Sequence, residues 1–271
     1  MTDLVVREYG VGVETVIAMH GGPAAAGDLA PLARTLGERW HVLEPHQRGS
    51  SDRPLTVATH VQDLDDLIRT RCGASQPILV GHSWGAMLAL VYAAHHPQAP
   101  AALVLIGCGT FSQAARAEFE ARRAARLTAA AHARLVQITQ AETDPDRRLA
   151  ERGRVMASVY GYEVDDGQND LAVVDAVAHE QTWADMVRLI NQGVYPATFA
   201  AITCPVLMLH GEADPHPGRL TSEDLRAHIP RLEYREFSKC GHSPWLERQA
   251  RDVFFESINE WIAGQWQGVL R

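Results

Sequence analysis

The chain has 271 residues, of which 46% are hydrophobic and 21% charged, and its 25 basic and 33 acidic side chains give a formal net charge of −8. The apolar content and the length exclude disorder for the bulk of the chain, and the negative charge disfavours nucleic acid as a partner. No apolar stretch reaches the ~18 residues of a membrane span, and the charged Asp3, Arg7 and Glu8 argue against a secretory signal, so we expect a cytoplasmic protein with no membrane partner.

Short aliphatic and β-branched runs predict the strands of a sheet. Most of these runs are apolar throughout, which is typical of strands buried on both faces. Helical patterns such as His60–Arg71 and Ala86–His95 lie between several of them. Because strand and helix alternate, we expect an α/β fold with a mostly parallel, doubly wound sheet. The predicted strands are Thr15–Met19, Trp40–Leu43, Ile78–Val80, Leu103–Ile106, Val206–Leu209 and Leu232–Phe237.

The alternation stops between Phe111 and Thr203. This stretch has long helical patterns over Ala114–Gln140, Arg147–Tyr160 and Leu171–Asn191, and no convincing strand. The strand pattern resumes at Pro205. We therefore predict one core domain, made of residues 1–110 and 204–271, with residues 111–203 inserted as a helical cap, or lid, beside the site.

Ser83 lies in the sequence Gly81-His82-Ser83-Trp84-Gly85, after the strand predicted at Ile78–Val80 and before the helix predicted from Ala86. This is the G-x-S-x-G pattern in its strand-turn-helix context. A nucleophilic serine there occupies a strained turn, and glycines two positions to either side let the strand and helix backbones approach each other. The pattern predicts that Ser83 is a nucleophile.

A serine nucleophile needs a base within hydrogen-bond reach, and the base needs an acid that fixes its tautomer. The expected chain order is serine, acid, histidine. Asp214 follows the strand predicted at Val206–Leu209, and we prefer it to Glu212 because it lies further out on the loop. Of the 13 histidines, His242 alone lies on a loop after a late strand. We therefore predict Asp214 and His242 as the partners of Ser83.

Acyl transfer also needs hydrogen-bond donors where the oxyanion forms. The backbone N–H of Trp84, the residue after the nucleophile, is one candidate. The second should come from a loop after an early strand, and His20-Gly21-Gly22-Pro23 follows Thr15–Met19 at that place. We predict Gly22 as the second donor, with a glycine-rich turn of no ligand role as the alternative.

These motifs and two others resemble the α/β-hydrolase superfamily, in its order and over the whole chain apart from the helical insertion. The resemblance implies a triad of Ser83, Asp214 and His242, a helical cap over the site, and no cofactor. It implies a serine hydrolase of the carboxylesterase or aminopeptidase type, acting through an acyl-enzyme. The motifs are His20-Gly21-Gly22-Pro23, Gln47-Arg48-Gly49, Gly81-His82-Ser83-Trp84-Gly85, Gly211-Glu212-Ala213-Asp214 and Gly241-His242-Ser243.

Within the superfamily, the first and third motifs and the segment Gly241–Glu247 are similar to proline iminopeptidases, which anchor a free amine on an acidic cap residue. Asp185, close to Trp183, is the candidate anchor, and an exposed helix residue is the alternative. The chain departs from that branch at His46, where an aspartate usually precedes Gln-Arg-Gly. The same motifs occur in esterases and C–C bond hydrolases. We therefore expect a small molecule or short peptide as substrate, and the motifs leave open whether an ester, an amide or a C–C bond is cleaved.

Sites of other kinds have little support. The four cysteines form no C-x-x-C pair, the histidines lack metal-ligand spacing, and neither G-x-G-x-x-G nor a P-loop is present, so we predict no metal and no nucleotide. Trp183 and Trp245 are candidates for lining a substrate pocket, with core packing as the alternative. The intact set of catalytic residues favours an enzyme over a ligand-binding sensor of the same fold. No pattern predicts an oligomeric state.

Overall fold

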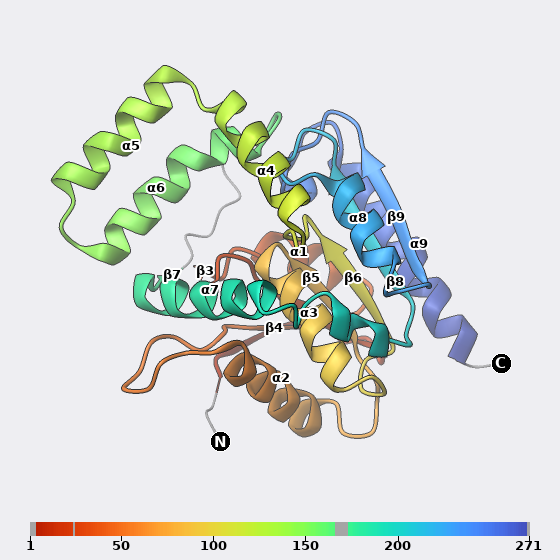
Figure 1. The fold of residues 1–271 in the computed structure, drawn as a ribbon. Helices are drawn as coiled ribbons and strands as arrows, with labels where there is room; N and C mark the ends of the chain where they lie inside the picture. Colours follow the sequence, from red (N-terminus) through yellow and green to blue (C-terminus); the bar gives the residue numbers. More distant parts are fainter. Residues whose placement is uncertain (1–3, 24, 166–172, 270–271) are drawn as a thin grey trace.

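The computed structural model describes residues 4–23, 25–165 and 173–269, and a seven-stranded sheet lies at its centre (Figure 1). All neighbouring strands pair in parallel except β1 and β4, which are antiparallel. The predicted α/β fold with a mostly parallel sheet is therefore confirmed. In spatial order the strands are β1 Val6–Tyr9, β4 His41–Pro45, β2 Thr15–Met19, β5 Ile78–His82, β6 Ala102–Ile106, β8 Val206–Gly211 and β9 Leu232–Phe237.

Helices cover both faces of the sheet. Because side chains alternate along a strand, Leu79 packs into one apolar cluster and Val80 into the other. The helices α2 (Val57–Arg71), α3 (Trp84–His95) and α8 (Gly218–Arg226) contribute to the first cluster. The second contains residues of α1 (Ala30–Leu36) and α9 (Arg251–Val269). The sheet is thus doubly wound, as the alternation predicted.

Not every predicted strand is buried on both faces. The ranges of β2 and β9 match the predicted ones, but β9 is buried only at its two ends because it is an edge strand. The sequence reading missed β1, whose residues are half-buried or exposed. It also missed the two-residue strand β3, Ala25–Ala26. β1 has charged residues at its centre and β3 has only two residues, so neither has the apolar run on which such a prediction depends.

Four helices fill most of the predicted insertion: α4 Gln113–Arg126, α5 Ala129–Ala141, α6 Pro145–Tyr160 and α7 Ala176–Asn191. The single helical stretch predicted at Ala114–Gln140 is two helices. Leu127 is extended, and the hydroxyl of Thr128 accepts a hydrogen bond from the amide of Ala131, so Thr128 caps a new helix. A 3₁₀ helix, Ala197–Ala201, precedes β8.

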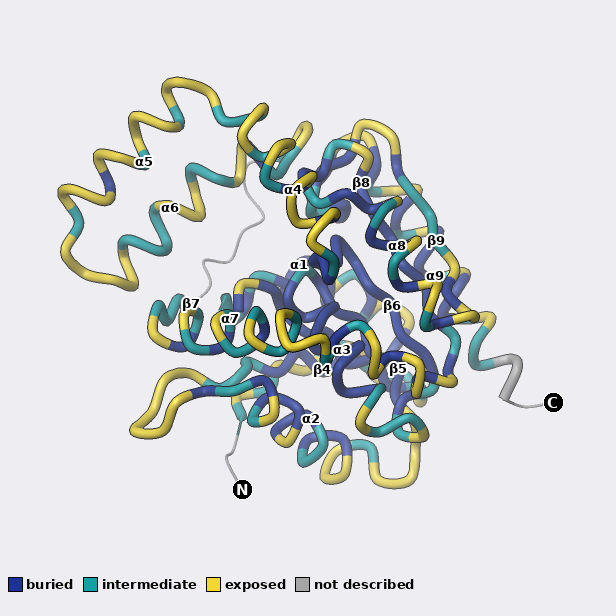
Figure 2. The backbone as a smooth tube through the Cα atoms, in the orientation of Figure 1, coloured by how far each residue is buried: buried dark blue, intermediate teal, exposed yellow. Residues whose placement is uncertain are grey.

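The insertion also contains one short strand, which the sequence reading did not expect. Val173–Val174 forms β7 and pairs antiparallel with β3. The start of the helix predicted at Leu171 lies outside the described residues. The hairpin of α5 and α6 extends away from the sheet (Figure 1) and is mostly exposed or half-buried along its length (Figure 2). That residues 111–203 act as a cap stays a prediction.

Among the helices of the described residues, none combines the length and the apolar character needed to cross a bilayer.

Candidate active site

Ser83 sits in a sharp turn between β5 and α3, with φ 54° and ψ −114°. Its amide donates to the carbonyl of Ile106 on the neighbouring strand at 2.8 Å. A β-carbon at Gly85 would overlap the carbonyl oxygen of Met19, and one at Gly81 would overlap the carbonyl of Gly85. The helix can begin this close to the sheet only because both positions lack a side chain, and this packing holds the serine in a sparsely populated backbone conformation.

The loop after β2 lies against this turn. A β-carbon at Gly21 would be 3.1 Å from the Cβ of Ser83. His20 is fully buried; its Nδ1 donates to the carbonyl of Gly21 at 2.9 Å and its Nε2 accepts the amide of Gln47 at 3.0 Å. Burial lowers the pKa of His20 to about 4, which keeps the imidazole neutral and able to accept. The hydrogen bonds of His20 therefore hold the loop that contains Gly22 in place.

Trp84 is the first residue of α3, so its amide has no partner within the helix. Its indole Nε1 donates to Oε1 of Gln47 at 2.6 Å, and Nε2 of Gln47 donates to the carbonyl of His20 at 2.9 Å. Gln47 thus ties the predicted oxyanion loop to the start of α3. The Gln-Arg-Gly motif marked this residue, but its spacing alone did not show the contact.

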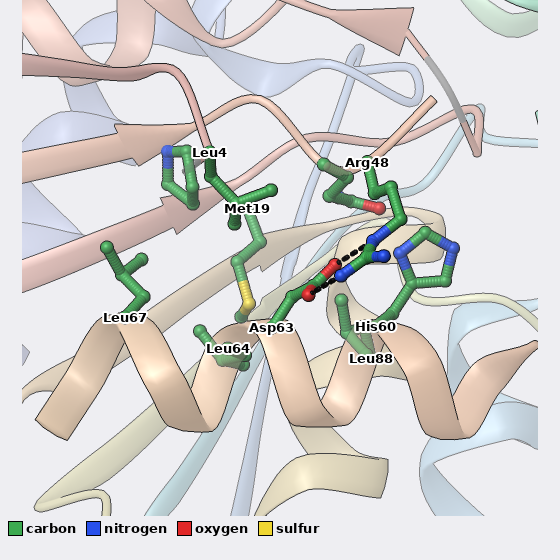
Figure 3. A pocket seen from close by; sticks show the side chains of 10 residues that line it. Leu4, Met19, Arg48, His60, Asp63, Leu64, Leu67 and Leu88 are labelled. Atoms are coloured by element: carbon green, nitrogen blue, oxygen red, sulfur yellow. Dashed lines mark hydrogen bonds and ion pairs between the residues drawn. The ribbon is translucent and has the colours of Figure 1, made fainter. Parts of the chain in front are cut away.

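The adjacent Arg48 makes an ion pair with Asp63 on α2, Nε donating to Oδ2 at 2.8 Å (Figure 3). These two residues line a cavity of about 20 Å³ together with His60 and Met19. A cavity of this size is close to what one water molecule occupies. It is too small for a substrate.

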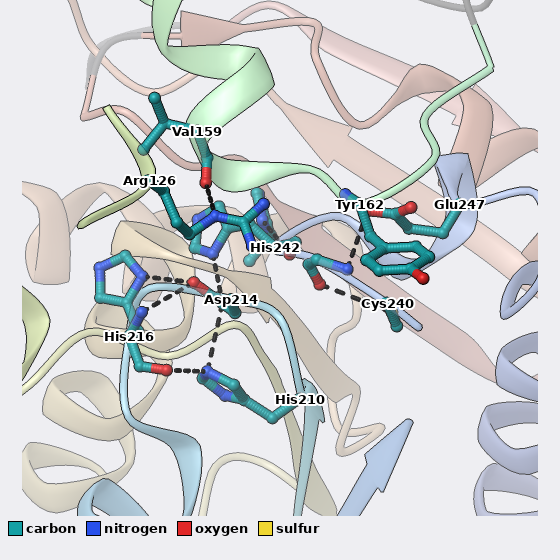
Figure 4. Close-up of polar contacts among 11 residues, drawn as sticks. Arg126, Val159, Tyr162, His210, Asp214, His216, Cys240, His242 and Glu247 are labelled. Carbon is teal, nitrogen blue, oxygen red and sulfur yellow. Dashed lines mark hydrogen bonds and ion pairs between the residues drawn. The ribbon is translucent and has the colours of Figure 1, made fainter. Parts of the chain in front are cut away.

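Asp214 and His242 come together at the carboxyl ends of β8 and β9 (Figure 4). Nδ1 of His242 donates to Oδ2 of Asp214 at 2.7 Å, and the carboxylate is 1% exposed. Burial alone would raise the pKa of Asp214, but the facing His242, His216 and His210 outweigh it and hold the pKa well below its usual range. The carboxylate is therefore ionised at neutral pH. Glu212, the alternative acid, is exposed.

The imidazole of His242 packs against His82, the residue before Ser83, with ring centroids 4.6 Å apart. Nε2 of His82 bonds to the carbonyl oxygen of His242 at 3.2 Å. Among the described side chains there is no hydrogen bond between Ser83 and the His242 ring. Contacts of this kind are often long in ligand-free sites and shorten when substrate binds.

The sequence signature of the alpha/beta hydrolase fold matches residues 14–249. The chain belongs to this family. It is 22% identical over 275 residues to a proline iminopeptidase from Lactobacillus delbrueckii subsp. lactis, covering 92% of this chain and 90% of that protein. It is 30% identical over 214 residues to a 2-(acetamidomethylene)succinate hydrolase from Mesorhizobium japonicum, covering 77% and 73%. A crystal structure of E-2-(acetamidomethylene)succinate hydrolase shares the fold, with a TM-score of 0.64, 22% identity and coverage of 96% and 95%. These relatives are hydrolases.

The three predicted substrate-binding residues of this α/β-hydrolase lie in different surroundings. Trp183 is half-buried on α7, with the guanidinium of Arg116 5.7 Å from its ring centroid. Asp185 accepts a hydrogen bond from the amide of Val57, at the start of α2, at 2.8 Å, and it pairs with Arg188. The carboxylate that was the candidate amine anchor is thus engaged in holding α2 to α7.

Trp245 is 2% exposed and packs against His82 and Phe254, with ring centroids 4.7 and 6.4 Å away. It belongs to the apolar cluster on the face of the sheet that α1 and α9 cover. Its surroundings therefore fit the core-packing alternative. Its ring makes an edge-on contact with the ring of His82.

One group among the described residues has side-chain atoms close enough together to hold a metal ion: Asp214, His216 and His242. In both histidines, Nδ1 faces the carboxylate of Asp214 at hydrogen-bond distance. In this structure the three side chains therefore form one hydrogen-bonded network.

Two residues of the site were missed by sequence reasoning. His216 contacts Asp214 from the same loop. Glu247 is fully buried, and its carboxylate accepts the amides of Gly241 and Tyr162 at 2.8 Å and of Glu163 at 2.7 Å. An acid next to the apolar Pro244-Trp245-Leu246 was the available signal for Glu247. No spacing rule pointed to His216.

Proposed function

We propose that this α/β-hydrolase is a serine hydrolase that cleaves small esters or N-terminal amides through an acyl-enzyme. His242 takes the proton from Ser83 as the hydroxyl attacks the substrate carbonyl, and Asp214 stabilises the imidazolium that forms. The observation that carries the proposal is the 2.7 Å bond between His242 and a buried, ionised Asp214, two strands from the strained turn of Ser83.

The amides of Trp84 and Gly22 are the proposed oxyanion donors. Trp84 begins α3 directly after the nucleophile, so its N–H lies at the N-terminus of the helix. Developing negative charge is favoured at that end. Gly22 follows Gly21, at which an added β-carbon would be 3.1 Å from the Cβ of Ser83, so this loop lies against the turn of the nucleophile. Removing a single such donor typically costs ~3 kcal/mol in the transition state.

Residues 111–203 are the proposed cap. Their first helix, α4, reaches the site through Phe119, whose ring stacks on His216 at 4.3 Å. The end of α6 also reaches it, because the carbonyl of Tyr160 accepts the amide of His242 at 2.9 Å. Side chains of these helices therefore border the space next to the proposed triad, where they would select the substrate.

An ester is the better-supported substrate. Proline iminopeptidase is among the relatives, but Asp185 is occupied by Val57 and Arg188 and is not free to bind an amine. α/β-Hydrolases that cleave different bonds hold their substrates in different ways. No other acidic anchor for an N-terminal amine was predicted in the insertion. Aminopeptidase activity is therefore the second candidate.

The test compares steady-state rates on p-nitrophenyl acetate and on proline β-naphthylamide. We expect turnover of the ester to fall by about 10⁴-fold or more in Ser83→Ala and to stay unchanged in Ser75→Ala, a control in an exposed loop. A preference of about a thousandfold for the proline amide, or ~4 kcal/mol, would instead select the aminopeptidase. If the protein binds a ligand but shows no Ser83-dependent turnover, the result would favour a ligand-binding sensor of the same fold and overturn the proposal.

A further inference from the structure

Two imidazoles share the carboxylate of Asp214 (Figure 4). His242 donates from Nδ1 to Oδ2 at 2.7 Å, and His216 donates from Nδ1 to Oδ1 at 3.0 Å. The backbone amide of His216 donates to the same Oδ1 at 2.9 Å. A base in the proposed mechanism needs only the first of these contacts. The second imidazole is therefore a feature that the mechanism leaves unexplained.

His216 is also the middle ring of a stack. Its centroid lies 4.8 Å from that of His242 with planes 23° apart, and 4.3 Å from that of Phe119 with planes 20° apart. Its side chain is 13% exposed. One face of the His242 ring is thus covered by His216, which α4 in turn presses against through Phe119. The ring of His82 also lies next to the His242 ring, with centroids 4.6 Å apart.

The charged and titratable groups around this pair come from four elements. Nε2 of His210, at the end of β8, donates to the carbonyl of His216 at 3.0 Å and lies 3.2 Å from Oδ2 of Asp214. Tyr160 of α6 has its ring 5.7 Å from His216 and 5.2 Å from His242. The guanidinium groups of Arg116 and Arg123 lie near Phe119 on α4, and both pair with Glu120. His82 completes the set from the turn of Ser83 between β5 and α3, here called the elbow.

The tautomer of His216 follows from these contacts. Burial lowers the pKa of His216, an effect that the facing Asp214 only partly offsets, so the ring is neutral at neutral pH. Because an ionised carboxylate can only accept, the proton of the neutral ring is on Nδ1. The carboxylate thus receives a neutral donor on Oδ1, which leaves less of its negative charge for the donor on Oδ2.

We propose that His216 is a positioning residue for the Asp214–His242 pair, holding Oδ1 of the carboxylate through Nδ1–H and covering one face of the His242 ring. This inference rests on the proposed function. It assigns two separable effects to one side chain. The hydrogen bond weakens the pull of Asp214 on the His242 proton, and the stack limits rotation of the ring that must take the proton from Ser83.

Two variants separate these effects. His216→Phe keeps a ring in the stack but removes the Nδ1–H, whereas His216→Asn keeps an amide donor near Oδ1 but removes the ring. In His216→Phe, we expect the acid limb of the pH profile of kcat/KM to move up by about one pH unit, since a hydrogen bond to a charged group is typically worth that much. In His216→Asn, we expect the limb to stay within about 0.3 unit and kcat to fall about tenfold, because proton transfer depends on geometry.

The control is His132→Phe, which changes an exposed histidine on α5 and should leave both the profile and kcat unchanged. Superimposable profiles for wild type and His216→Phe, with equal kcat in His216→Asn, would overturn the inference while leaving Ser83-dependent turnover intact. Absence of Ser83-dependent turnover in the wild type would instead overturn the proposed function.

A measurement on the unchanged chain covers the case in which the variants do not fold. In ¹⁵N-labelled protein, NMR should show His216 as the neutral Nδ1–H tautomer at pH 7. A proton on Nε2 with bare Nδ1, or a charged ring at pH 7, would contradict the proposed hydrogen bond. Either result would be obtained without any activity assay.

Discussion

The amide of Ser83 is hydrogen-bonded to a strand of the sheet, whereas the amide of His242 is hydrogen-bonded to the inserted segment. The amide of Ser83 bonds to Ile106 of β6, and α3 packs directly on β2. The amide of His242 bonds to the carbonyl of Tyr160, at the end of α6. The two halves of the proposed catalytic pair therefore depend on different parts of the chain.

Glu247 strengthens this difference. Its buried carboxylate accepts one amide from the His242 loop, at Gly241, and two from the segment after α6, at Tyr162 and Glu163. No comparable side chain joins the insertion to the elbow among the residues that the structure describes. The elbow should thus tolerate changes in the insertion, while the position of His242 should respond to them.

The largest effect is expected at the elbow itself. In Gly85→Ala the new methyl group would overlap the carbonyl of Met19 and lie 2.7 Å from that of His20. Both obstacles are backbone atoms of the sheet, which cannot rotate away. We expect a loss of about 3 kcal/mol or more in the free energy of unfolding, measured by urea denaturation. Stability within about 0.5 kcal/mol of wild type would contradict the close approach of α3 and β2.

The next largest effect is expected where the insertion meets the His242 loop. In Glu247→Gln, one oxygen that accepts backbone amides becomes an NH₂ group facing them, which should cost about 1–3 kcal/mol. We also expect kcat to fall, because Gly241 precedes the histidine. Glu256→Gln, on the exposed face of α9, is the control. Equal losses in both variants would show that Glu247 has no special role in joining the two regions.

A third prediction concerns Asp28, which follows the strand β3 that pairs with β7 of the insertion. Burial and the nearby Glu44 raise the pKa of Asp28 to about 8, and its Oδ1 has no hydrogen-bond partner among the described residues. The unfolded chain titrates near ~3.9. The folded state therefore binds more protons between about pH 4 and pH 8, and the stability from the neutral carboxyl is lost as pH rises through this range.

Asp28→Asn should remove that loss. Relative to wild type, the variant should gain up to about 4 kcal/mol more stability at pH 8.5 than at pH 5, because an amide does not ionise. Chemical denaturation at the two pH values measures the difference, with Asp52→Asn in an exposed loop as the control. Parallel pH dependence in wild type and Asp28→Asn would contradict the raised pKa.

The smallest effect is expected in the hairpin far from the sheet. Gly153 lies within α6, and a β-carbon there would meet no atom within 4 Å. Gly153→Ala should stabilise the helix by about 0.5–1 kcal/mol, because alanine loses less backbone entropy than glycine in a helix. The same substitution at Gly85 has the opposite sign, so the pair contrasts the two regions directly. A loss of stability in Gly153→Ala would mean that this face of α6 is covered.

Much of the sheet could be predicted because its central strands are apolar on both faces. β5 and β6 are buried at every residue, and the sequence shows Ile78–Val80 and Ala102–Ile106 as unbroken apolar runs. The edge strand β1 is half-buried at its two ends and exposed in the middle, and it gave no such run. The break at Thr128 was also missed, since alanine-rich sequence on both sides favours helix and only the capping hydroxyl marks the boundary.

The candidate site was predictable where a motif fixes both a residue and its place after a strand. Ser83, Asp214 and His242 follow β5, β8 and β9, and parallel strands bring their carboxyl ends to one edge. His216 and Glu247 were harder to predict, because some of their contacts, Phe119 for His216 and Tyr162 and Glu163 for Glu247, come from the insertion. The folding of the insertion onto the sheet, which spacing rules do not describe, sets those contacts.

The double-mutant cycle of Ser83→Ala and His242→Ala tests the central claim most directly. Each single variant should lower kcat on p-nitrophenyl acetate by about 10⁴-fold or more, and the double variant should be little worse than either, because the two side chains act as one unit. Losses that multiply in the double variant, or a His242→Ala variant with wild-type kcat, would show that His242 does not serve Ser83 as its base.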